Sequence, residues 1–564
     1  MSFFATDEAA LKVFQSVADA IKEEGVEVAF ALMGDANQNL IVDLAERCGV
    51  KIVNFRHEQN AVAAADGYAR FSDGKLGVAL VTMGPGLTNA ATSLAAARAH
   101  RSPVLVLAGA ASVGEMQNPQ RFDQASFSHL LAGAGAVLES PKSLKLQLDQ
   151  AFGHMRRGTG PFVLNLPGNI QNEEAPKGWK YQPGYAGYQA TVPAGDALPK
   201  AAQILAQARC PGILAGRGAL RARAAGVVSE LASYLNAPVA TTLPAKGLCS
   251  EYALWTGVSG GLGEGVALPI FAACDVLLVV GASLNQWTSH AGDLVRDKTV
   301  IQIDSDLEAF GRYAHADLIL HGDARATGQA LLDALRREAG TQREENTSLV
   351  TSIAKNWQLH RKAIDYETGE DGSIDPRQAV RELDRLLPSD RLVVVGGGHA
   401  GYLVCQLLKV RSPFDWNYTI DFGALGQSLG TAIGAAFARP NDRVYHLTTD
   451  GEFMMNLADF HTAVNYKLPM TVVILNDQGF GQERHDLEHK KLPIKYAMQH
   501  SPDFAKLAEG FGARGSRFDT PDSLAGLQSA LQRAEDAEGP TVIDIRINGD
   551  YESPVSQEIA KALA

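Results

Sequence analysis

Two aspartates that follow neighbouring apolar runs constrain this chain more than any other feature. Asp450 comes directly after the run 444–449, and Asp477 follows the run 470–475 almost at once. The segment 456–465 between the runs has helical periodicity. One β-α-β unit needs about 30 residues, so we expect both aspartates at the carboxyl ends of adjacent parallel strands, where open α/β sheets bind ligands. The spacing therefore predicts two carboxylates that face one point.

Such a pair suits a divalent cation that holds a phosphorylated ligand. Mg²⁺ prefers a few oxygen ligands together with substrate phosphates. The amides of Gly451 and Glu452 are expected to begin a helix whose N-terminus attracts anions. Gly479 would add a carbonyl from a turn too tight for a side chain. We therefore predict Asp450, Asp477 and Gly479 as metal ligands, although an isolated aspartate after a strand is often only a turn residue.

The same residues resemble the cofactor signature of the thiamine diphosphate enzymes of the acetolactate synthase and pyruvate decarboxylase superfamily. That signature is usually written G-D-G, followed at a distance by N-N or N-D. Two departures are visible, because Thr449 stands where the first glycine is usual and Asp477 replaces the commoner second asparagine. Neither removes an oxygen ligand, and the extra charge of Asp477 should tighten metal binding. The resemblance implies thiamine diphosphate and Mg²⁺ as cofactors.

A second motif lies in the first part of the chain, from Arg56 to Arg70. It resembles the H-E-x-x-A-x-x-x-A-x-G-Y-A-R helix of the same superfamily. The resemblance implies that Glu58 bonds to N1′ of the aminopyrimidine and favours the tautomer whose nitrogen removes the C2 proton. The plain alternative is a glutamate that stabilises a helix N-terminus through the helix dipole.

Two further turns resemble segments that pass beside the cofactor in this superfamily. Gly84 and Asn89 belong to the first of them, a turn between a strand and a helix. His399 follows three glycines after another apolar run, and this glycine-rich turn is expected to add amides to the diphosphate, although such a turn alone is weak evidence. Gly423 would bind the pyrimidine through its backbone, and Leu425 would be the bulky residue that wedges under the cofactor. The alternatives are a helix cap for Asn89 and an ordinary core position for Leu425.

The substrate side gives a mixed resemblance. Asp35 lies in a segment similar to the F-A-x-x-G-D-x-N turn of the decarboxylases, and Glu483 falls where those enzymes place a catalytic glutamate. Both are candidate acids or bases, and two neighbouring carboxyls favour one that stays protonated. The paired histidines of the decarboxylases are absent, however, and Asp123-Gln124 is closer to the F-Q-E type of the synthases. We expect Gln124 to reach the substrate, unless it is an ordinary polar loop residue.

The pattern of helices and short apolar strands predicts an α/β protein with three doubly wound parallel sheets. Expected strands include 29–32, 76–81, 104–108, 162–166, 212–215, 276–280, 300–303 and 392–395. The resemblance gives an N-terminal cofactor-binding (PYR) domain, a central Rossmann-like domain, a C-terminal cofactor-binding (PP) domain and a tail, over residues 1–185, 190–340, 370–550 and 551–564. A Pro- and Gly-rich stretch, 175–195, suggests a linker. The resemblance also implies a cofactor held between two subunits, so we expect at least a homodimer and predict a homotetramer.

Charge and targeting signals exclude other classes of function. The 564-residue chain has a formal charge of −12, which argues against nucleic acid as a partner. It begins without a secretory pattern and has no apolar run long enough to span a bilayer, so no membrane association is expected. Its five scattered cysteines suit thiols in a reducing compartment. These features predict a cytoplasmic location.

The prediction is an enzyme that joins or cleaves C–C bonds of a 2-oxo acid with thiamine diphosphate and Mg²⁺. Acetolactate synthase-like carboligation with decarboxylation is the first choice. Simple decarboxylation to an aldehyde and C–C cleavage of a 2-hydroxyacyl or diketone substrate remain alternatives, as does a non-catalytic regulatory homologue. In the central domain, similar positions of relatives hold FAD, ADP or nothing, and the sequence leaves FAD open.

Overall fold

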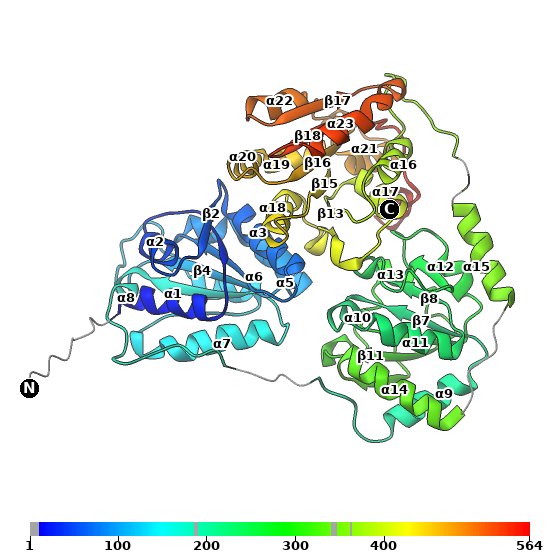
Figure 1. Cartoon of the computed structure of the whole chain (residues 1–564), viewed down its shortest axis with the longest axis horizontal. Helices are drawn as coiled ribbons and strands as arrows, with labels where there is room; N and C mark the ends of the chain where they lie inside the picture. Colours follow the sequence, from blue (N-terminus) through cyan, green and yellow to red (C-terminus); the bar gives the residue numbers. More distant parts are fainter. Residues whose placement is uncertain (1–10, 185–189, 340–346, 361, 363, 564) are drawn as a thin grey trace, which may run out of the picture.

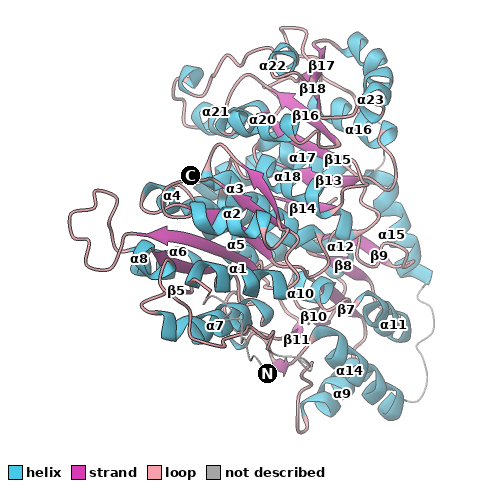
Figure 2. Ribbon diagram, turned by 60° about the vertical axis from the view of Figure 1, so that its left-hand side comes forward, coloured by secondary structure: helices cyan, strands magenta, loops and turns pink. Residues whose placement is uncertain are grey.

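Three six-stranded sheets, each parallel throughout, organise the computed structural model (Figure 1). The structure describes residues 11–184, 190–339, 347–360, 362 and 364–563. Figure 2 shows that the strands lie inside, with helices on both sides. This confirms the predicted α/β class with three doubly wound sheets.

The first sheet has the order β2-β1-β3-β4-β6-β5. Its strands are β1 (Val28–Ala31), β2 (Lys51–Asn54), β3 (Gly77–Val81), β4 (Val104–Ala110), β5 (Gly135–Val137) and β6 (Phe162–Pro167). Its helices are α1 (Val13–Glu23), α2 (Gln38–Glu46), α3 (Glu58–Phe71), α4 (Pro85–Thr88), α5 (Ala91–His100), α6 (Gln124–Ala132), η1 (Pro141–Ser143), α7 (Leu144–Arg156) and α8 (Gly168–Gln171). Part of the predicted linker packs onto this domain, because Trp179 contacts its core and Tyr181 is buried in it. Aromatic side chains gain more from such burial than from exposure in a surface linker.

The central sheet has the order β12-β11-β10-β7-β8-β9. Its strands are β7 (Pro211–Ala215), β8 (Val239–Thr241), β9 (Trp255–Val258), β10 (Val276–Val280), β11 (Thr299–Asp304) and β12 (Leu318–His321). Its helices are α9 (Ala197–Gln207), α10 (Arg217–Arg221), α11 (Ala225–Leu235), η2 (Leu243–Ala245), α12 (Ala267–Phe271), α13 (Gln286–Ser289), η3 (Leu307–Ala309), α14 (Ala324–Ala339) and α15 (Thr347–His360). Read from β9, this is the Rossmann order 3-2-1-4-5-6.

The third sheet has the order β14-β13-β15-β16-β18-β17, which repeats the topology of the first sheet. Its strands are β13 (Leu392–Val395), β14 (Trp416–Tyr418), β15 (Val444–Thr449), β16 (Met470–Asn476), β17 (Arg514–Phe518) and β18 (Thr541–Arg546). Its helices are α16 (Pro376–Leu386), α17 (His399–Leu407), η4 (Pro413–Asp415), η5 (Asp421–Gly423), α18 (Ser428–Ala438), α19 (Asp450–Met455), α20 (Leu457–Asn465), α21 (Gly481–His489), η6 (Ile494–Tyr496), α22 (Phe504–Gly510), η7 (Pro521–Gly526), α23 (Leu527–Glu535) and α24 (Pro554–Leu563).

The first and third domains meet through helices α3 and α18, which lie side by side (Figures 1 and 2). Glycines allow the two backbones to touch. A Cβ atom added to Gly67 would lie 2.2 Å from the carbonyl oxygen of Thr431, and one added to Gly434 would lie 2.0 Å from that of Ala64. One apolar cluster continues across the contact and joins the cores of both sheets.

No described helix combines the length and the apolar character that crossing a bilayer requires.

Candidate active site

Asp450 opens α19 directly after β15, as the spacing predicts, and is completely buried. The Ser501 hydroxyl donates to its Oδ2 at 2.5 Å. Its Oδ1 is also buried, and no hydrogen-bond donor reaches it from the described residues. Burial and then the charge of Asp477 raise the pKa of Asp450 well above its ordinary value. An orphaned acceptor beside a second carboxylate fits a bound divalent cation, which would satisfy both groups.

Asp477 follows the neighbouring strand β16, which pairs in parallel with β15. Burial raises the pKa of its carboxyl group. The Nδ1 atom of His399 lies 3.3 Å from Asp477 Oδ2, and both side chains are almost fully buried. Burial lowers the pKa of His399 to about 3, so the ring is neutral near pH 7. His399 therefore contacts Asp477 through its ring, and it is the first residue of α17, directly after the glycine-rich turn.

Two glycines, Gly451 and Gly479, allow close packing of the backbone beside the two aspartates. A Cβ atom on Gly479 would lie 2.6 Å from the carbonyl oxygen of Ala497, which agrees with a turn too tight for a side chain. A Cβ atom on Gly451 would lie 2.8 Å from the Phe480 ring and 3.4 Å from the Gly479 carbonyl oxygen. Within the described ranges, no group of three or more His, Cys, Asp or Glu side chains forms a metal cluster. Two carboxylates with a nearby carbonyl fit Mg²⁺, which completes its shell with phosphates and water.

Glu452 places its carboxylate inside the third domain. Its Oε1 accepts from the backbone amides of Gly426 at 3.1 Å and Ser428 at 3.3 Å, at the start of α18. Thr448 donates to its other oxygen at 3.3 Å. A negative charge at this position stabilises a helix N-terminus. The side chain of Glu452 thus fixes the turn before α18, while the residue's amide lies in the first turn of α19.

Glu58 is the first residue of α3, and only 6% of it is exposed. His57 caps the helix by accepting from the Gln59 amide at 3.1 Å. Asn89 donates to Glu58 Oε2 at 3.0 Å, so Asn89 orients this carboxylate. The next side chain, Gln59, donates to the carbonyl oxygen of Gly426 at 2.9 Å. The N-terminus of α3 and the turn that contains Leu425 therefore share one interface between the first and third domains.

Leu425 is partly buried and lies against the glycine-rich turn after β13. A Cβ atom on Gly397 would lie 2.2 Å from Leu425 Cδ2, so only glycine leaves room for this leucine. Gly423 has a φ of 68°, and a Cβ atom added to it would have no neighbour within 4 Å. An exposed turn with a partly buried leucine differs from an ordinary core position.

The two candidate acid or base residues on the substrate side, Asp35 and Glu483, lie in different domains. Asp35 is exposed after β1 and accepts from Gln38 at 3.4 Å. Glu483 is on α21 in the third domain, where burial of its carboxyl and, more weakly, Asp486 raise its pKa. The roles of Asp35 and Glu483 stay predictions.

Gln124 has a buried, fully engaged side chain within the first domain. It donates to the Gly109 carbonyl at 2.9 Å and to Asn165 at 2.8 Å, and it accepts from the Gly84 amide at 3.2 Å. It thereby fixes the Gly84 turn, whose φ of 59° suits glycine. The neighbouring Asp123 caps α6 by accepting from Ser126. The structure gives Gln124 a bracing role in this turn, and its contact with substrate stays a prediction.

Some site residues carry no sequence signal. Ser501 binds Asp450 from a loop before α22, and Asn456 donates to the Gly426 carbonyl from the end of α19. His485 packs edge to face on His399, with ring centroids 5.4 Å apart. Each of these residues lies on a different segment of the chain from its partner, so no local sequence motif could reveal the contact.

In the central domain, the strand order reverses between β7 and β10. The loops after these strands touch, because Gly218 donates to the Gly281 carbonyl at 2.8 Å and a Cβ on Gly216 would lie 2.3 Å from the same oxygen. A cavity of 1460 Å³ opens beside them, where the three domains meet. Arg217 and Trp287 line it from the central domain.

Comparisons with known proteins agree with this architecture. The family described as thiamine pyrophosphate enzyme, N-terminal TPP binding domain, matches residues 11–129. The central domain of the same enzymes matches residues 198–331, and their C-terminal TPP binding domain matches residues 396–545. The matches follow the three sheets in order.

Full-length relatives carry related names. The chain is 29% identical to a probable acetolactate synthase large subunit of Methanocaldococcus jannaschii, over 95% of this chain and 92% of the relative. It is 28% identical to the acetolactate synthase isozyme 3 large subunit of Escherichia coli, over 95% and 94%. It is 26% identical to a sulfoacetaldehyde acetyltransferase of Castellaniella defragrans, over 96% and 94%. With three matching domains and relatives along nearly its whole length, the chain belongs to the thiamine pyrophosphate-dependent enzymes of the acetolactate synthase-like superfamily.

Proposed function

We propose that this protein uses thiamine diphosphate and Mg²⁺ to decarboxylate a 2-oxo acid and join the remaining fragment to a second carbonyl compound. The observation that carries the proposal is the buried pair Asp450 and Asp477, in which one oxygen of Asp450 lacks a donor from the described residues. Two buried carboxylates need a compensating cation. The similarity to acetolactate synthases over 95% of the chain supports carboligation as the reaction.

The chain's own residues divide the work between two domains. Asp450, Asp477 and the Gly479 carbonyl would hold Mg²⁺, and the amides at the start of α19 would face the diphosphate. When bound, thiamine diphosphate supplies a nucleophilic carbon and accepts the electron pair that departing carbon dioxide leaves behind. Glu58 would hold a proton at the pyrimidine ring, in an orientation that the hydrogen bond from Asn89 fixes.

Proton transfer to substrate needs a further group. Glu483 is the first candidate for this role, because the raised pKa of its carboxyl group keeps more of it protonated near neutral pH. Asp35 is the second candidate, in the turn that follows strand β1 of the first domain. An enzyme that protonates the decarboxylated fragment releases an aldehyde, whereas one that admits a second carbonyl compound makes an acyloin. This choice separates a decarboxylase from a synthase.

The reaction is tested by product analysis. We expect pyruvate, thiamine diphosphate and Mg²⁺ to give acetolactate with the purified protein, detected by NMR. Acetaldehyde would establish the decarboxylase alternative, and binding of thiamine diphosphate without turnover of any 2-oxo acid would support a non-catalytic homologue.

The Glu58→Gln variant tests the proposed mechanism. We expect at least a hundredfold lower kcat, because general acid-base groups contribute about 10² to 10⁴ in rate. The variant should still bind Mg²⁺ and inorganic pyrophosphate, whose ligands lie in the third domain. The exposed Glu46 of the same domain provides the matched control, Glu46→Gln, which should keep full activity. Unchanged turnover of Glu58→Gln would exclude the mechanism.

We also propose that the enzyme assembles at least as a homodimer, as its resemblance implies. Met33, Phe422 and Met454 are large apolar side chains that are 42% exposed or more, which fits burial against a second copy. Light scattering should give at least twice the chain mass of 60.1 kDa. A monomer that is fully active would contradict this assembly.

A further inference from the structure

A buried acid interrupts the apolar face of β18, an interior strand of the third sheet. Asp544 is completely buried, and Val542, on the same face, belongs to the apolar cluster that joins the cores of the first and third sheets. Asp544 lies beside Ile474 of β16, and Asn476 follows two residues later on the same face of that strand. A charged group at such a position costs free energy unless donors satisfy it. The donors that satisfy Asp544 therefore indicate what it does.

Three donors from separate segments reach the Asp544 carboxylate. Asn476 Nδ2 donates to Oδ1 at 2.9 Å, and the Phe504 amide donates to Oδ2 at 3.2 Å. Arg517 Nη1 lies 3.4 Å from Oδ2. Burial raises the pKa of Asp544 to about 6, and the hydrogen bond from Asn476 and the charge of Arg517 oppose that rise. The carboxyl group is thus mostly charged near pH 7, in the form that accepts from all three donors.

Asn476 connects Asp544 to the turn that carries two predicted metal ligands, Asp477 and Gly479. Because its Nδ2 donates to Asp544, its Oδ1 is the end that accepts, and it receives the Gln478 amide at 3.2 Å and Gln478 Nε2 at 2.9 Å. Gln478 has a φ of 67° although it is not glycine. Such a conformation persists only where the surroundings impose it. The side chain of Asn476 therefore fixes the turn that directs the Asp477 carboxylate and the Gly479 carbonyl.

The Asp544 carboxylate also holds the loop that brings Ser501 to Asp450. Phe504, whose amide donates to Asp544, begins α22 shortly after Ser501. Gln478 Nε2 donates to the Ser501 carbonyl oxygen at 3.2 Å, which ties this loop to the turn. The Ser501 hydroxyl donates to Asp450 Oδ2 at 2.5 Å. Hydrogen bonds that start at Asp544 thus lead to both aspartates of the predicted metal site.

We propose that Asp544 is a positioning residue of the metal site, which sets the turn that carries Asp477 and the loop that carries Ser501 in the arrangement that binds Mg²⁺. The inference rests on the proposed function, because it takes the aspartate pair as a Mg²⁺ site. Groups that hold metal ligands in place typically weaken metal binding by about 10- to 100-fold when they are lost. All of these residues belong to the third domain of one chain, so this part of the site needs no residue from a second subunit.

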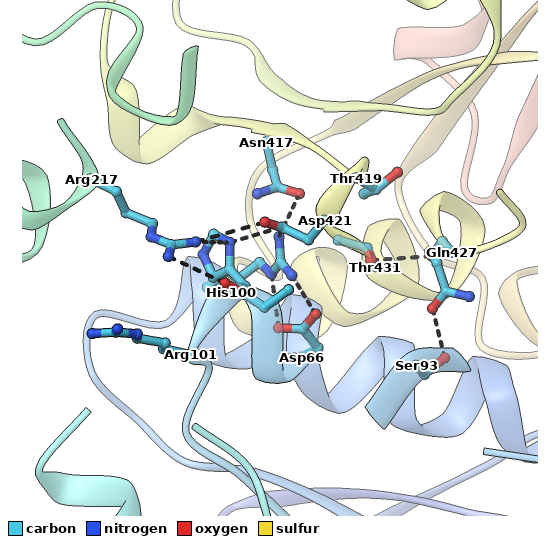
Figure 3. Close-up of polar contacts among 12 residues, drawn as sticks. Asp66, Ser93, His100, Arg101, Arg217, Asn417, Thr419, Asp421, Gln427 and Thr431 are labelled. Atoms are coloured by element: carbon cyan, nitrogen blue, oxygen red, sulfur yellow. Dashed lines mark hydrogen bonds and ion pairs between the residues drawn. The ribbon is translucent and has the colours of Figure 1, made fainter. Parts of the chain in front are cut away.

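Another acid of the same domain, Asp421, has different partners and provides a matched control. It is partly buried and contacts residues of both other domains (Figure 3). Arg70 of the first domain donates to its Oδ2 at 2.8 Å, and His100 Nδ1 lies 2.9 Å from the same oxygen. Arg217 of the central domain lies 3.7 Å from its Oδ1. The contacts of Asp421 thus join domains, whereas those of Asp544 hold segments of the third domain.

Calorimetric titration of Asp544→Asn with Mg²⁺ in the presence of inorganic pyrophosphate tests the proposal. We expect on the order of tenfold weaker binding, because the amide that replaces the carboxylate turns its own hydrogens toward some of the donors. The control Asp421→Asn should stay within twofold of the wild type. An affinity of Asp544→Asn within twofold of the wild type, or an equal loss in both variants, would overturn the positioning role. Failure of the wild type to bind Mg²⁺ with pyrophosphate would instead overturn the proposed function.

A double-mutant cycle tests whether Asp544 acts through Asn476. Asn476→Ala removes the acceptor of the Gln478 amide and should also weaken the binding of Mg²⁺ with pyrophosphate about tenfold. If both residues act through their shared hydrogen bond, the double variant should bind within about threefold of Asn476→Ala alone, because coupled residues are not additive. A loss of about a hundredfold, the product of two independent effects, would overturn the positioning role.

The Gln478→Ala variant keeps the test decisive if Asp544→Asn fails to fold, because Gln478 is only partly buried. It removes the hydrogen bond to Ser501, so we expect about threefold weaker binding of Mg²⁺ with pyrophosphate. Amide hydrogen exchange over residues 497–503 of the metal-free protein should also become faster. Gln499→Ala, at an exposed glutamine of the same loop, is the control and should match the wild type in both measurements. Equal affinities of Gln478→Ala and Gln499→Ala would overturn the proposal.

Discussion

At the scale of single residues, the site depends on two buried acids that repel each other. Asp450 and Asp477 could be identified from the sequence because each follows a strand, and neighbouring parallel strands end at the same edge. Their partners could not be identified. Ser501 approaches from 51 positions away, and His399 reaches Asp477 from the end of a different strand. These contacts depend on how the third domain folds as a whole.

The Asp477→Asn substitution should raise the melting temperature of the metal-free protein but lower its affinity for Mg²⁺. Without Mg²⁺ and cofactor, we expect the variant to melt a few degrees higher, because one of two buried carboxylates is gone. Its Mg²⁺ affinity should fall on the order of tenfold, because a neutral oxygen replaces a charged ligand. Melting curves with and without Mg²⁺ measure both effects. Asp390→Asn, at an exposed aspartate of the same domain, is the control. A lower melting temperature of the metal-free variant would contradict the repulsion.

At the scale of elements, α3 and α18 are equivalent helices of two sheets that share one topology. Each follows the strand that lies at the edge of its sheet, β2 or β14, and leads into the third strand of the domain. The small residues of both helices let their backbones touch, and this contact joins the cores of the two domains. The helices are recognisable from periodicity and motif, whereas their mutual contact is not.

Gly67→Ala tests this contact. The added methyl group would lie 2.2 Å from the Thr431 carbonyl oxygen, so backbone must move. We expect a loss of about 2 kcal/mol and a melting temperature several degrees lower.

The matched control is Gly226→Ala within α11, where an added Cβ has no neighbour within 4 Å. That change should be neutral or stabilise the protein by up to about 1 kcal/mol, because alanine favours a helix. If the Gly67→Ala variant has the same melting temperature as the wild type, the two helices do not pack as closely as the structure indicates.

At the scale of the whole molecule, buried histidines link stability to pH. His446 is completely buried in β15, and burial lowers its pKa to about 3. In the unfolded chain its pKa is about 6.5. Below pH 6.5 the unfolded state therefore binds a proton that the folded state does not. Stability from this group is complete above pH 6.5 and falls as pH drops toward 3, by up to about 1.4 kcal/mol per pH unit.

His446→Gln should reduce this acid sensitivity. Between pH 6.5 and 4.5 we expect the melting temperature of the variant to fall less than that of the wild type. His315→Gln is the control, because the His315 side chain is 83% exposed. Its melting profile should follow that of the wild type, and equal slopes for all three proteins would contradict the assignment.

Strands that are continuous apolar runs could be predicted from the sequence, whereas short or partly polar strands, including the interior strands β8 and β18, could not. The expected strands 276–280 and 392–395 coincide with β10 and β13, because such central strands are continuous apolar runs. Short edge strands such as β2, whose residues are largely exposed, lack that signal. The domain limits themselves stay predictions, and Tyr181 shows that part of the expected linker belongs to the first domain's core.

The sequence by itself determined the family, the three parallel sheets and the places of Glu58, Asp450 and Asp477. Those features are local, because each depends on the periodicity of one segment or on a residue at a strand or helix end. Only the tertiary structure decided which of these segments meet. Gln59 with Gly426 and Arg70 with Asp421 are pairs more than 340 positions apart. Their contact arises from the packing of two complete domains, and no spacing within either domain specifies it.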